Sequence, residues 1–451
     1  EISCSLVGSE MCIRDRLHSE EKETMKKIMK GACLSLAILL GSLSFSQTIE
    51  APSLLHSFSA ETGQALHSLA VGPGLVNLSP ADEFSTYQWG LKNDGEFRLV
   101  ELQSKFQSVD NVYDGIKSSM GIDLPKPGPG DYESKVTKAV PGIDINIQPA
   151  WTLYDKAENK RSVIVAIIDT GIDINHQELK DSIWTNPGEI DGDGVDNDGN
   201  GFVDDIHGWN FYSGNNQIFS GKDDSHGTHA AGTIGAARGA YGIAGITDNQ
   251  HVKIMPLKAL GGKDGTGTPD AVIQAIHYAQ ANGASICNLS MGTTSYSPQL
   301  AETIKNSPML FVVSAGNGGI SGLGYDTDIN PVYPASLPYD NVISVANILF
   351  DGSLSKDSNF GVKSVDIAAP GSYILSTIPN NGYGFMSGTS MAAPMVTGVA
   401  AMLYSYRTDI SLLETKQILL DSSRRLDTLN GKVLSGGILD AYGALTWSTG
   451  N

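Results

Sequence analysis

The sequence predicts an α/β domain of three layers, in which helices flank a mainly parallel central sheet. Six short runs are largely apolar, several of them rich in β-branched residues, as is typical of parallel strands buried on both faces. Segments with helical caps and glycine stops lie between these runs, and strands that alternate with helices indicate parallel pairing. The six runs are Val163–Ile168, Val252–Pro256, Ser285–Leu289, Met309–Val313, Val342–Ala346 and Val365–Ala368.

Three segments between or after these strands are expected to be helices. Residues 271–281 follow Thr268-Pro269-Asp270, which supplies a cap and a first-turn proline, and end at the stop signal Asn282-Gly283. Ala230–Gly235 consists mostly of small residues, which allow a helix to approach its neighbours closely. Met391–Tyr404 is apolar along most of its length and is expected to lie in the core.

Composition limits the class of protein. A chain of 451 residues can hold one large domain of about 250–300 residues with extensions. The formal net charge of -19 argues against nucleic acid or an anionic membrane as a partner. Three of the four cysteines lie in the first 33 residues, which leaves Cys287 as an expected core residue and no disulfide framework.

The first 46 residues are predicted to be absent from the folded protein. Residues 25–46 have the pattern of a secretory signal peptide of bacterial type, with an apolar stretch Ala32–Leu43 and small residues at Ser44-Phe45-Ser46 before the cleavage site. The apolar stretch is too short to span a membrane. A signal peptide begins near its start codon, so residues 1–24 are interpreted as a sequencing or translation artefact. We therefore expect a secreted protein.

The rest of the chain divides into two parts. Residues 47–141 form an N-terminal extension with a distinctive cluster at Tyr87–Leu91, a possible helix at Val100–Phe106 and a linker at Pro125–Gly130. From 142 to 451 the alternation of strands and helices is continuous, and this segment is expected to be the main domain.

Four polar side chains are candidates for chemistry because each lies at the end of a predicted element. Asp169 directly follows the first strand, at the carboxyl edge where active groups gather in parallel sheets. Ser390 begins a helix, where unpaired N–H groups and the helix dipole favour a nucleophile whose attack creates an oxyanion. His226 opens another helix and could serve as a base. Asn317 follows a strand and could aim its amide at an oxyanion.

Each of these residues also has an ordinary structural explanation. An aspartate after a strand is commonly a turn or a helix cap, and Asn317-Gly318 could be a simple turn. His226 and His229 could bind a metal or be satisfied core residues, but no third ligand with a recognised spacing lies nearby. The segment around Ser390 could be a buried turn before a core helix.

Taken in order, the motifs closely resemble those of the subtilisin-like serine proteases, the subtilases or peptidase family S8. The motifs are Asp169-Thr170-Gly171, His226-Gly227-Thr228-His229, Ser314-Ala315-Gly316-Asn317 and Gly388-Thr389-Ser390-Met391-Ala392-Ala393-Pro394. The order Asp, His, Ser along the chain is that of this family. The resemblance is patchy from Tyr87 and almost continuous from Gly142 to about Leu445, and it implies a subtilisin-like fold with a catalytic domain at 142–451.

The resemblance also implies a role for each candidate residue. Ser390 would attack the scissile carbonyl while His226 takes its proton and later delivers it to the leaving amine. Asp169 would orient His226 and stabilise the imidazolium ion. The side chain of Asn317 and the backbone N–H of Ser390 would hold the oxyanion.

Substrate binding is expected at two glycine-rich segments, between which the family holds an extended peptide by main-chain pairing. The first specificity pocket should be lined by Ser290–Gly292 and Ala315–Asn317. Because Gly318 carries no acid, we expect an apolar or aromatic substrate residue before the cleaved bond. The substrate-binding residues implied are Gly265, Thr266, Gly267, Ser290, Met291, Gly292, Ala315 and Gly316.

A dense carboxylate run at Asp191–Asp205 predicts a structural calcium site, because these charges would repel one another without a cation. Position 12 of the loop is His207 rather than glutamate, which excludes a complete EF-hand, and a merely solvated loop is the alternative. The predicted ligands are Asp196, Asp198, Asn200, Phe202 through its carbonyl, and Asp204. Glu178 matches a calcium ligand of the family, and Asp326 with Asp328 could hold a further cation or be ordinary surface acids.

The main functional hypothesis is a secreted serine endopeptidase with structural Ca²⁺ and no organic cofactor. It is expected to act on polypeptides as a monomer, without nucleic acid partners or stable membrane association. Two alternatives stay open: a dedicated protease for particular pro-peptides, and a non-catalytic binding protein on the same scaffold. The short extension departs from the family, since an inhibitory pro-domain would be missing, shortened or partly formed by residues 96–140. Met395 replaces a histidine often found there.

Overall fold

In a computed structural model of the chain, the described residues are 82, 84–98, 137–319 and 322–448, together with the backbone of β1 (Ile2–Cys4) and β2 (Ser57–Phe58). The predicted signal peptide at 25–46 lies outside the described residues, as do the possible helix at Val100–Phe106 and the linker at Pro125–Gly130.

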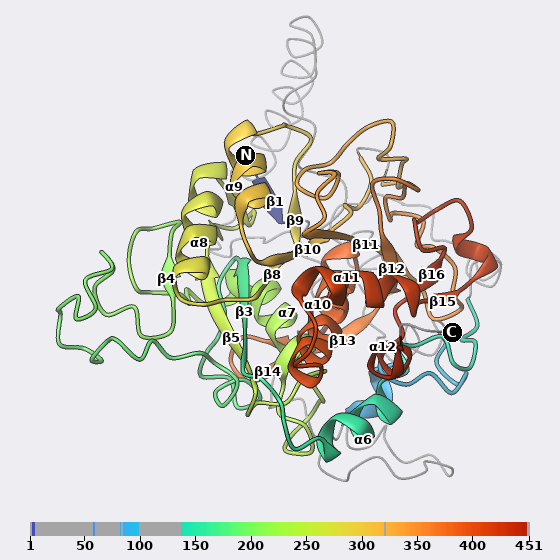
Figure 1. The fold of residues 1–451 in the computed structure, drawn as a ribbon, viewed down its shortest axis with the longest axis horizontal. Coiled ribbons are helices and arrows are strands. Elements are labelled where there is room, and N and C mark those ends of the chain that lie inside the picture. Colours follow the sequence, from blue (N-terminus) through green and yellow to red (C-terminus); the bar gives the residue numbers. More distant parts are fainter. Residues whose placement is uncertain are drawn as a thin grey trace, which may run out of the picture.

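A nine-stranded sheet forms the centre of the molecule, in the order β15-β16-β12-β11-β10-β8-β3-β5-β4 (Figure 1). Its pairs are parallel except for β15 with β16. All six predicted strands form, each within two residues of its expected bounds: β3 (Val163–Asp169), β5 (Val252–Lys258), β8 (Ile286–Leu289), β10 (Leu310–Ser314), β11 (Val342–Ile348) and β12 (Ile367–Pro370). The remaining strands are β4 (Trp209–Asn210), β15 (Arg424–Arg425) and β16 (Gly437–Ile438).

Helices cover both faces of this sheet, which confirms the three-layer α/β prediction. Alternate residues of β3 point to opposite cores: Val165 and Ile167 pack on the side of α7 (Ser225–Gly235) and α10 (Thr389–Tyr406), while Ala166 and Ile168 pack on the other side. That other face carries α8 (Pro269–Ala281) and α9 (Pro298–Asn306), which lie side by side in Figure 1. The remaining helices are α6 (Ile147–Lys156), α11 (Leu412–Asp421) and α12 (Ala441–Thr446). Short 3₁₀ helices lie at η2 (Ser85–Tyr87), η3 (Lys222–Asp224) and η4 (Asp427–Leu429).

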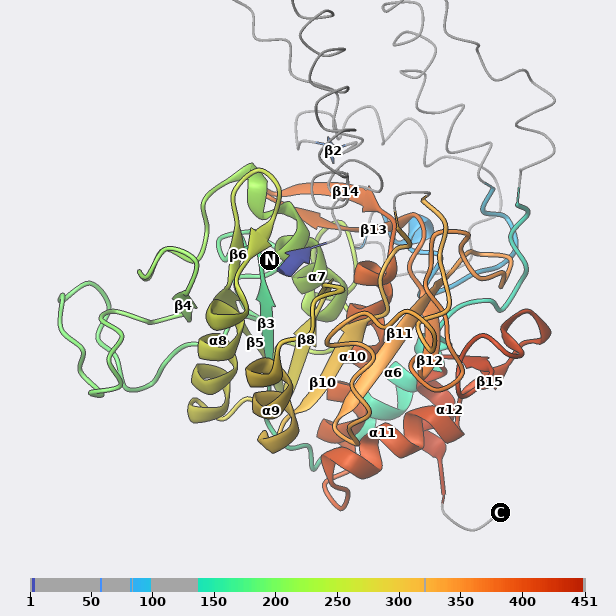
Figure 2. The ribbon, with the colours of Figure 1, turned by 90° about the horizontal axis from the view of Figure 1, so that it is seen from above.

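Two small antiparallel sheets complete the architecture. One contains β6 (Leu260–Gly261), β7 (Thr266–Gly267) and β9 (Met291–Gly292), with β1 between β7 and β9. The other is the hairpin of β13 (Ile374–Ile378) and β14 (Gly382–Met386), with β2 on the outer edge of β14. Figure 2 shows this hairpin alongside α7, and the two elements are in contact.

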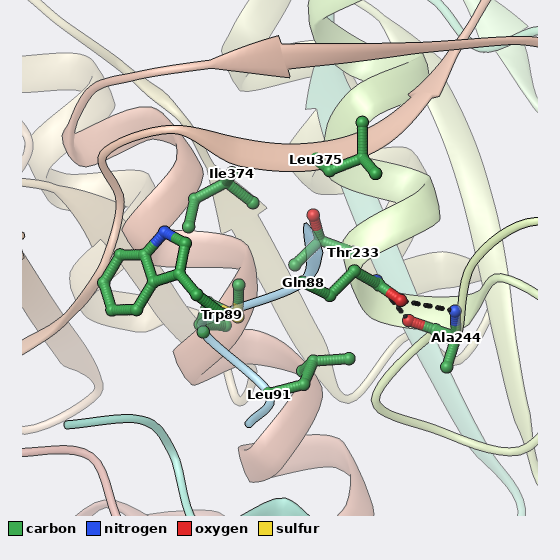
Figure 3. A pocket seen from close by; sticks show the side chains of 9 residues that line it. Gln88, Trp89, Leu91, Thr233, Ala244, Ile374 and Leu375 are labelled. Carbon is green, nitrogen blue, oxygen red and sulfur yellow. Dashed lines mark hydrogen bonds between the residues drawn. The ribbon is translucent and has the colours of Figure 1, made fainter. Parts of the chain in front are cut away.

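The segment 84–98 joins the core of the main domain. Trp89 is 1% exposed, and its indole N–H donates to the carbonyl of Ser372 at 2.9 Å. The side-chain amide of Gln88 pairs in both directions with the backbone of Ala244, as Figure 3 shows. These residues line a small cavity that also borders Thr233 on α7, the helix that carries His226. The segment therefore supports a helix that the proposed chemistry requires.

The core prediction for Cys287 is confirmed, since this residue is 0% exposed within β8 and burial raises the pKa of its thiol. Among the described residues, none of the helices has both the length and the apolar character needed to cross a membrane.

Candidate active site

Asp169 is the last residue of β3 and is 1% exposed. Directly after it, Gly171 adopts a φ of +121°, and a Cβ placed there would lie 2.6 Å from the carbonyl oxygen of Ile218. Only glycine allows the chain to turn away so closely behind the carboxylate. The motif Asp169-Thr170-Gly171 therefore combines a buried acid with the turn that leaves it at the sheet edge.

His226 lies in the first turn of α7 and pairs directly with Asp169. Its Nδ1 lies 2.8 Å from Oδ1 and 3.0 Å from Oδ2 of the carboxylate, and both side chains are 1% exposed. Gly227 makes this approach possible, because an added Cβ would meet the carbonyl oxygen of Gly171 at 2.3 Å. A carboxylate can only accept, so Nδ1 carries the proton and Nε2 carries the lone pair. Nε2 is buried and has no hydrogen-bond partner within the described part of the chain.

Ser390 begins α10 beside the same edge of the sheet and is 0% exposed. It exchanges two hydrogen bonds with Ser290: its Oγ donates to the Ser290 carbonyl at 3.2 Å, and the Ser290 hydroxyl donates to its carbonyl at 2.9 Å. Since β3 and β8 pair Ile167 with Asn288, the residues two positions later, Asp169 and Ser290, lie at neighbouring strand ends. The structure thus brings Ser390 to the edge that holds Asp169 and His226.

Asn317 lies against the turn that precedes Ser390. Its Oδ1 accepts hydrogen bonds from the N–H of Thr389 at 2.8 Å and from the hydroxyl of Thr389 at 2.9 Å. The same hydroxyl accepts from the N–H of Gly316 at 3.1 Å. Because Thr389 donates to Oδ1, the amide N–H₂ of Asn317 points away from Thr389. Nδ2 lies close to Gly388, where an added Cβ would be only 2.9 Å from it. Thr389 was not among the predicted site residues, although it stands inside the serine motif.

The two predicted substrate segments form β7 and β9, and they hold an extended strand between them. That strand is β1, which belongs to the segment 1–24 interpreted above as an artefact, and its Ser3 pairs antiparallel with Thr266 on one side and with Gly292 on the other. Position 267 requires glycine, because a Cβ there would lie only 2.3 Å from the carbonyl oxygen of Ala259. The backbone edges of β7 and β9 are therefore spaced to receive a peptide in the extended conformation.

The remaining residues predicted to contact substrate follow β10. Ala315 is buried, and Gly316 has a φ of +97° with the Asn359 amide 2.6 Å from the position of a Cβ. Asn359 donates to the Ala315 carbonyl and accepts from Gly318, which fixes this turn. Ala315 and Gly316 thus directly precede Asn317 in a turn that Asn359 holds by hydrogen bonds.

Carboxylates of the acidic segment converge, but on a different set of residues from the predicted one. Glu189, Asp198 and Asp205 each offer an oxygen within 4.8 Å of the others, and Asp205 is 0% exposed. Of these three, only Asp198 was predicted. Glu189 lies before the carboxylate run Asp191–Asp205, and Asp205 comes one residue after Asp204, the last of the predicted ligands. Glu189 would have been found only by including the turn that precedes the run.

The other predicted calcium ligands surround this cluster. The carboxylate of Asp196 accepts from the N–H groups of Asn200 and Gly201, and the amide of Asn200 donates to Asp198 and Asp205. Asp204 accepts from the N–H of Gly194. Phe202 contacts an aromatic group formed by Trp209, Phe211 and Tyr278. Three converging carboxylates form a donor set of the kind that suits Ca²⁺, and their oxygens also accept hydrogen bonds from the protein, as Asp205 does from Asn186 and Tyr278.

The additional cation candidates have other partners. Glu178 is buried, and its Oε1 accepts hydrogen bonds from the N–H groups of Gly242 and Ile243 and from the hydroxyl of Tyr383. Burial raises the pKa of this carboxyl. Asp328 accepts from Lys363 and Ser364, and Asp326 accepts from the N–H of Asp328. Oε2 of Glu178, however, is buried without a hydrogen-bond partner among the described residues, whereas Asp326 and Asp328 accept from N–H groups of the protein itself.

Known proteins resemble this chain in sequence and in structure. The family model described as the subtilase family matches residues 160–444. The major intracellular serine protease of Bacillus subtilis (strain 168) is 36% identical over 268 residues, which cover 59% of this chain and 75% of that protein. Subtilisin-like protease 1 of Plasmodium falciparum (isolate 3D7) is 34% identical over 333 residues, or 70% of this chain. That match covers 48% of the Plasmodium protein, so the chain spans about half its length.

A solved structure described as proteases from Pseudoalteromonas arctica aligns with a TM-score of 0.51 at 28% identity, over 67% of this chain and 93% of that one. The fold, the order of the motifs and the family match agree with one another. The chain therefore belongs to the subtilase family.

Proposed function

We propose that this member of the subtilase family is a secreted serine endopeptidase that cleaves polypeptides through Asp169, His226 and Ser390 by way of an acyl-enzyme. The observation that carries the proposal is the state of His226. Its Nδ1 lies 2.8 Å from the Asp169 carboxylate, while its Nε2 is buried without a hydrogen-bond partner in the described part of the chain. A buried lone pair at that position is suited to take a proton from a nucleophile.

The proposed reaction follows from this arrangement. Ser390 Oγ bonds to the scissile carbonyl carbon while its proton passes to His226 Nε2, and the imidazolium is stabilised by Asp169. The negative carbonyl oxygen is held by the Asn317 amide and the Ser390 N–H. The C–N bond then breaks, the amine leaves with the proton from His226, and an ester on Ser390 remains. Water, deprotonated by His226, hydrolyses that ester and restores the serine.

Action within a polypeptide is supported by the geometry of β7 and β9. An extended backbone pairs with Thr266 on one side and Gly292 on the other, and such main-chain pairing tolerates many sequences. For the residue before the cleaved bond we keep the preference for apolar or aromatic side chains. Digestion of casein compared with a peptide library separates a broad endopeptidase from a dedicated processing protease, which would cleave only rare library members.

We further propose one structural calcium ion, held by Glu189, Asp198 and Asp205 with the predicted carboxylate Asp196 nearby. Bound there, the ion would neutralise the carboxylates and fix the acidic segment. No step of peptide hydrolysis passes through it. The predicted set that includes Asn200, Phe202 and Asp204 remains a prediction.

Secretion rests on the predicted signal peptide at 25–46, and the expectation that nucleic acid and anionic membranes are not partners rests on the net charge of -19. A monomeric state stays a prediction. One relative is named an intracellular protease, so the compartment needs a direct test. Mass spectrometry of the N-terminus in medium and in cell lysate provides it. A protein that stays in the lysate with residues 25–46 attached would contradict secretion.

Labelling with a fluorophosphonate tests the nucleophile. The wild-type protein should be modified at Ser390, and Ser390→Ala should abolish labelling. Ser411→Ala, which changes a serine at the start of α11, should leave labelling unchanged. A folded wild-type protein that is neither labelled nor active on casein would instead favour a non-catalytic binding protein.

A further inference from the structure

A buried ion pair lies directly behind Asp169 and His226. Lys258 Nζ is 2.5 Å from the carboxylate of Asp224, and the side chains are 3% and 0% exposed. Lys258 is the last residue of β5, in register with Asp169 at the end of β3. Asp224 ends η3 and precedes His226 by two residues. Burying two charges is costly, and removing one partner alone leaves the other uncompensated.

The pair connects the three elements that hold the catalytic acid and base. Lys258 also donates to the carbonyl of Thr170, the residue after Asp169. Asp224 flanks the N-terminus of α7 without a side-chain capping bond, and its carbonyl accepts from the hydroxyl of Thr228. The Thr170 hydroxyl in turn accepts from the N–H of Gly227. The start of α7 is thus tied to the ends of β3 and β5.

The Asp224–Lys258 pair also contributes to the electrostatic environment of His226. The elements in contact with α7 are β3, β5, η3, α10 and β13, and the last two contain no Asp, Glu, Lys, Arg or His. The charged or titratable groups on the others and on α7 itself are Asp169, Lys253, Lys258, Lys222, Asp223, Asp224 and His229. Lys222 and Asp223 are exposed, and Lys253 is half-buried. The buried charged side chains on these elements are those of Asp169, Asp224 and Lys258. The loop after β3 adds Asp173, which is 5% exposed and whose backbone N–H donates to the hydroxyl of Thr228 on α7.

We propose that Asp224 and Lys258 form a positioning pair for His226, which fixes the start of α7 and, by cancelling each other's charge, leaves the carboxylate of Asp169 as the buried charge in direct contact with the imidazole. The inference rests on the proposed role of His226 as the base. Neither residue touches the reacting atoms. Burial raises the pKa of Asp224 while its bonds to Lys258 oppose this rise, in keeping with a carboxylate that depends on its partner.

Opposite shifts of a pH profile test the pair. Asp224→Asn leaves the ammonium uncompensated, which disfavours the imidazolium, so the acid limb of kcat/KM should move to lower pH by about one unit. Lys258→Met leaves the carboxylate uncompensated, so the limb should move to higher pH by about one unit. The double variant should return close to the wild-type profile. In each single variant kcat should fall about tenfold or more with KM nearly unchanged.

Two controls isolate the charge effect from loss of structure. Lys258→Arg keeps the charge and should keep the wild-type profile. Asp155→Asn breaks the surface pair of Asp155 with Arg238, where the aspartate is 55% exposed, and should shift nothing. Single variants that fold and show shifts of the same sign, or none, would overturn the proposal.

A second measurement does not depend on activity. In the Ser390→Ala background, NMR titration of the His226 imidazole should show the same opposite displacements in the two single variants. This separates two kinds of failure. An active enzyme whose imidazole is insensitive to both substitutions refutes the positioning pair alone, whereas a wild-type protein without any peptidase activity refutes the proposed function.

Discussion

The sheet edge that we propose to be catalytic and the acidic segment are built in contrasting ways. Asp169, His226 and Ser390 are at most 1% exposed, and each is placed by a strand or helix that packs into the core. The acidic segment lies mostly at the surface, and its side chains are held by hydrogen bonds to their own loop. The first region is therefore fixed by packing of the core, while the conformation of the second depends on its own hydrogen bonds and on the calcium ion that we propose. Substitutions at Asp169, His226 or Ser390 should therefore lower activity, whereas loss of the cation from the acidic segment should lower stability.

The largest expected effects are losses of kcat that leave the stability of the fold almost unchanged. Ser390→Ala or His226→Ala should lower kcat about 10⁶-fold, and Asp169→Asn about 10⁴-fold, which are the losses known for triads of this kind. Because Ser390→Ala removes one buried oxygen and creates little space, the melting temperature should change by only about 1–2 °C. Casein hydrolysis and calorimetry measure the two effects. Substantial residual activity in Ser390→Ala would contradict the nucleophile assignment.

The oxyanion asparagine should have the next largest effect. Asn317→Ala should lower kcat about 10²–10³-fold with KM nearly unchanged, the loss known for the corresponding donor in subtilisin. The control Asn306→Ala changes an exposed asparagine at the end of α9 and should leave kcat unchanged. An equal loss in both variants would show that the effect at Asn317 is not one of transition-state stabilisation.

Acid should weaken the buried region through His229. This residue is 0% exposed, its Nε2 donates to the carbonyls of Ile374 and Gly384, and burial lowers its pKa from 6.5 to about 4. Between these values the unfolded chain binds a proton that the folded chain does not. The contribution of His229 to the free energy of unfolding is thus complete above pH 6.5 and falls by about 3 kcal/mol as the pH drops to 4.

Urea unfolding of the inactive Ser390→Ala protein at a series of pH values measures this slope. His229→Gln should flatten it between pH 6.5 and 4, while the same change at the exposed His277 should leave it as it is. A slope unaffected by His229→Gln would assign acid sensitivity to other groups.

The smallest effect is expected from the acidic segment, and it should be one of stability. With free Ca²⁺ at about 100 times its dissociation constant, a site that exists only in the folded state adds about 2.7 kcal/mol. Chelation should then lower the melting temperature by about 5 °C, while kcat measured at once at 25 °C stays the same.

Two aspartate variants make this test specific. Asp205→Asn should remove the response to chelation, because Asp205 belongs to the carboxylate cluster. Asp191→Asn removes the same charge from an exposed position outside the cluster and should retain the response. Identical melting with and without chelator in the wild-type protein would remove the calcium assignment.

The sequence predicted the buried strands well because a parallel strand covered on both faces must be apolar along its length, as in Val163–Ile168. It did not predict β13 and β14, since a hairpin that contains Gly382 and Gly384 and packs on α7 has no continuous apolar run. The short α9 and α12 were likewise missed. Their few turns are stabilised mainly by tertiary contacts rather than by strong local periodicity.

At the site, the motifs located Asp169, His226, Ser390 and Asn317 because each stands at the end of an element whose position the pattern fixed. Residues that act through other residues were not found. Thr389 adjoins the serine, yet only the structure shows that its hydroxyl connects Asn317 with Gly316.

The sequence by itself determined the fold class, the family and the order of the motifs, because these depend on local periodicity and on short contiguous patterns. Tertiary structure alone decided that Lys258 meets Asp224 and that Glu189 meets Asp205, since such contacts join segments whose separation along the chain carries no signal of proximity. Burial and hydrogen bonding of charges are properties of the packed molecule. The chain encodes them only through the fold as a whole.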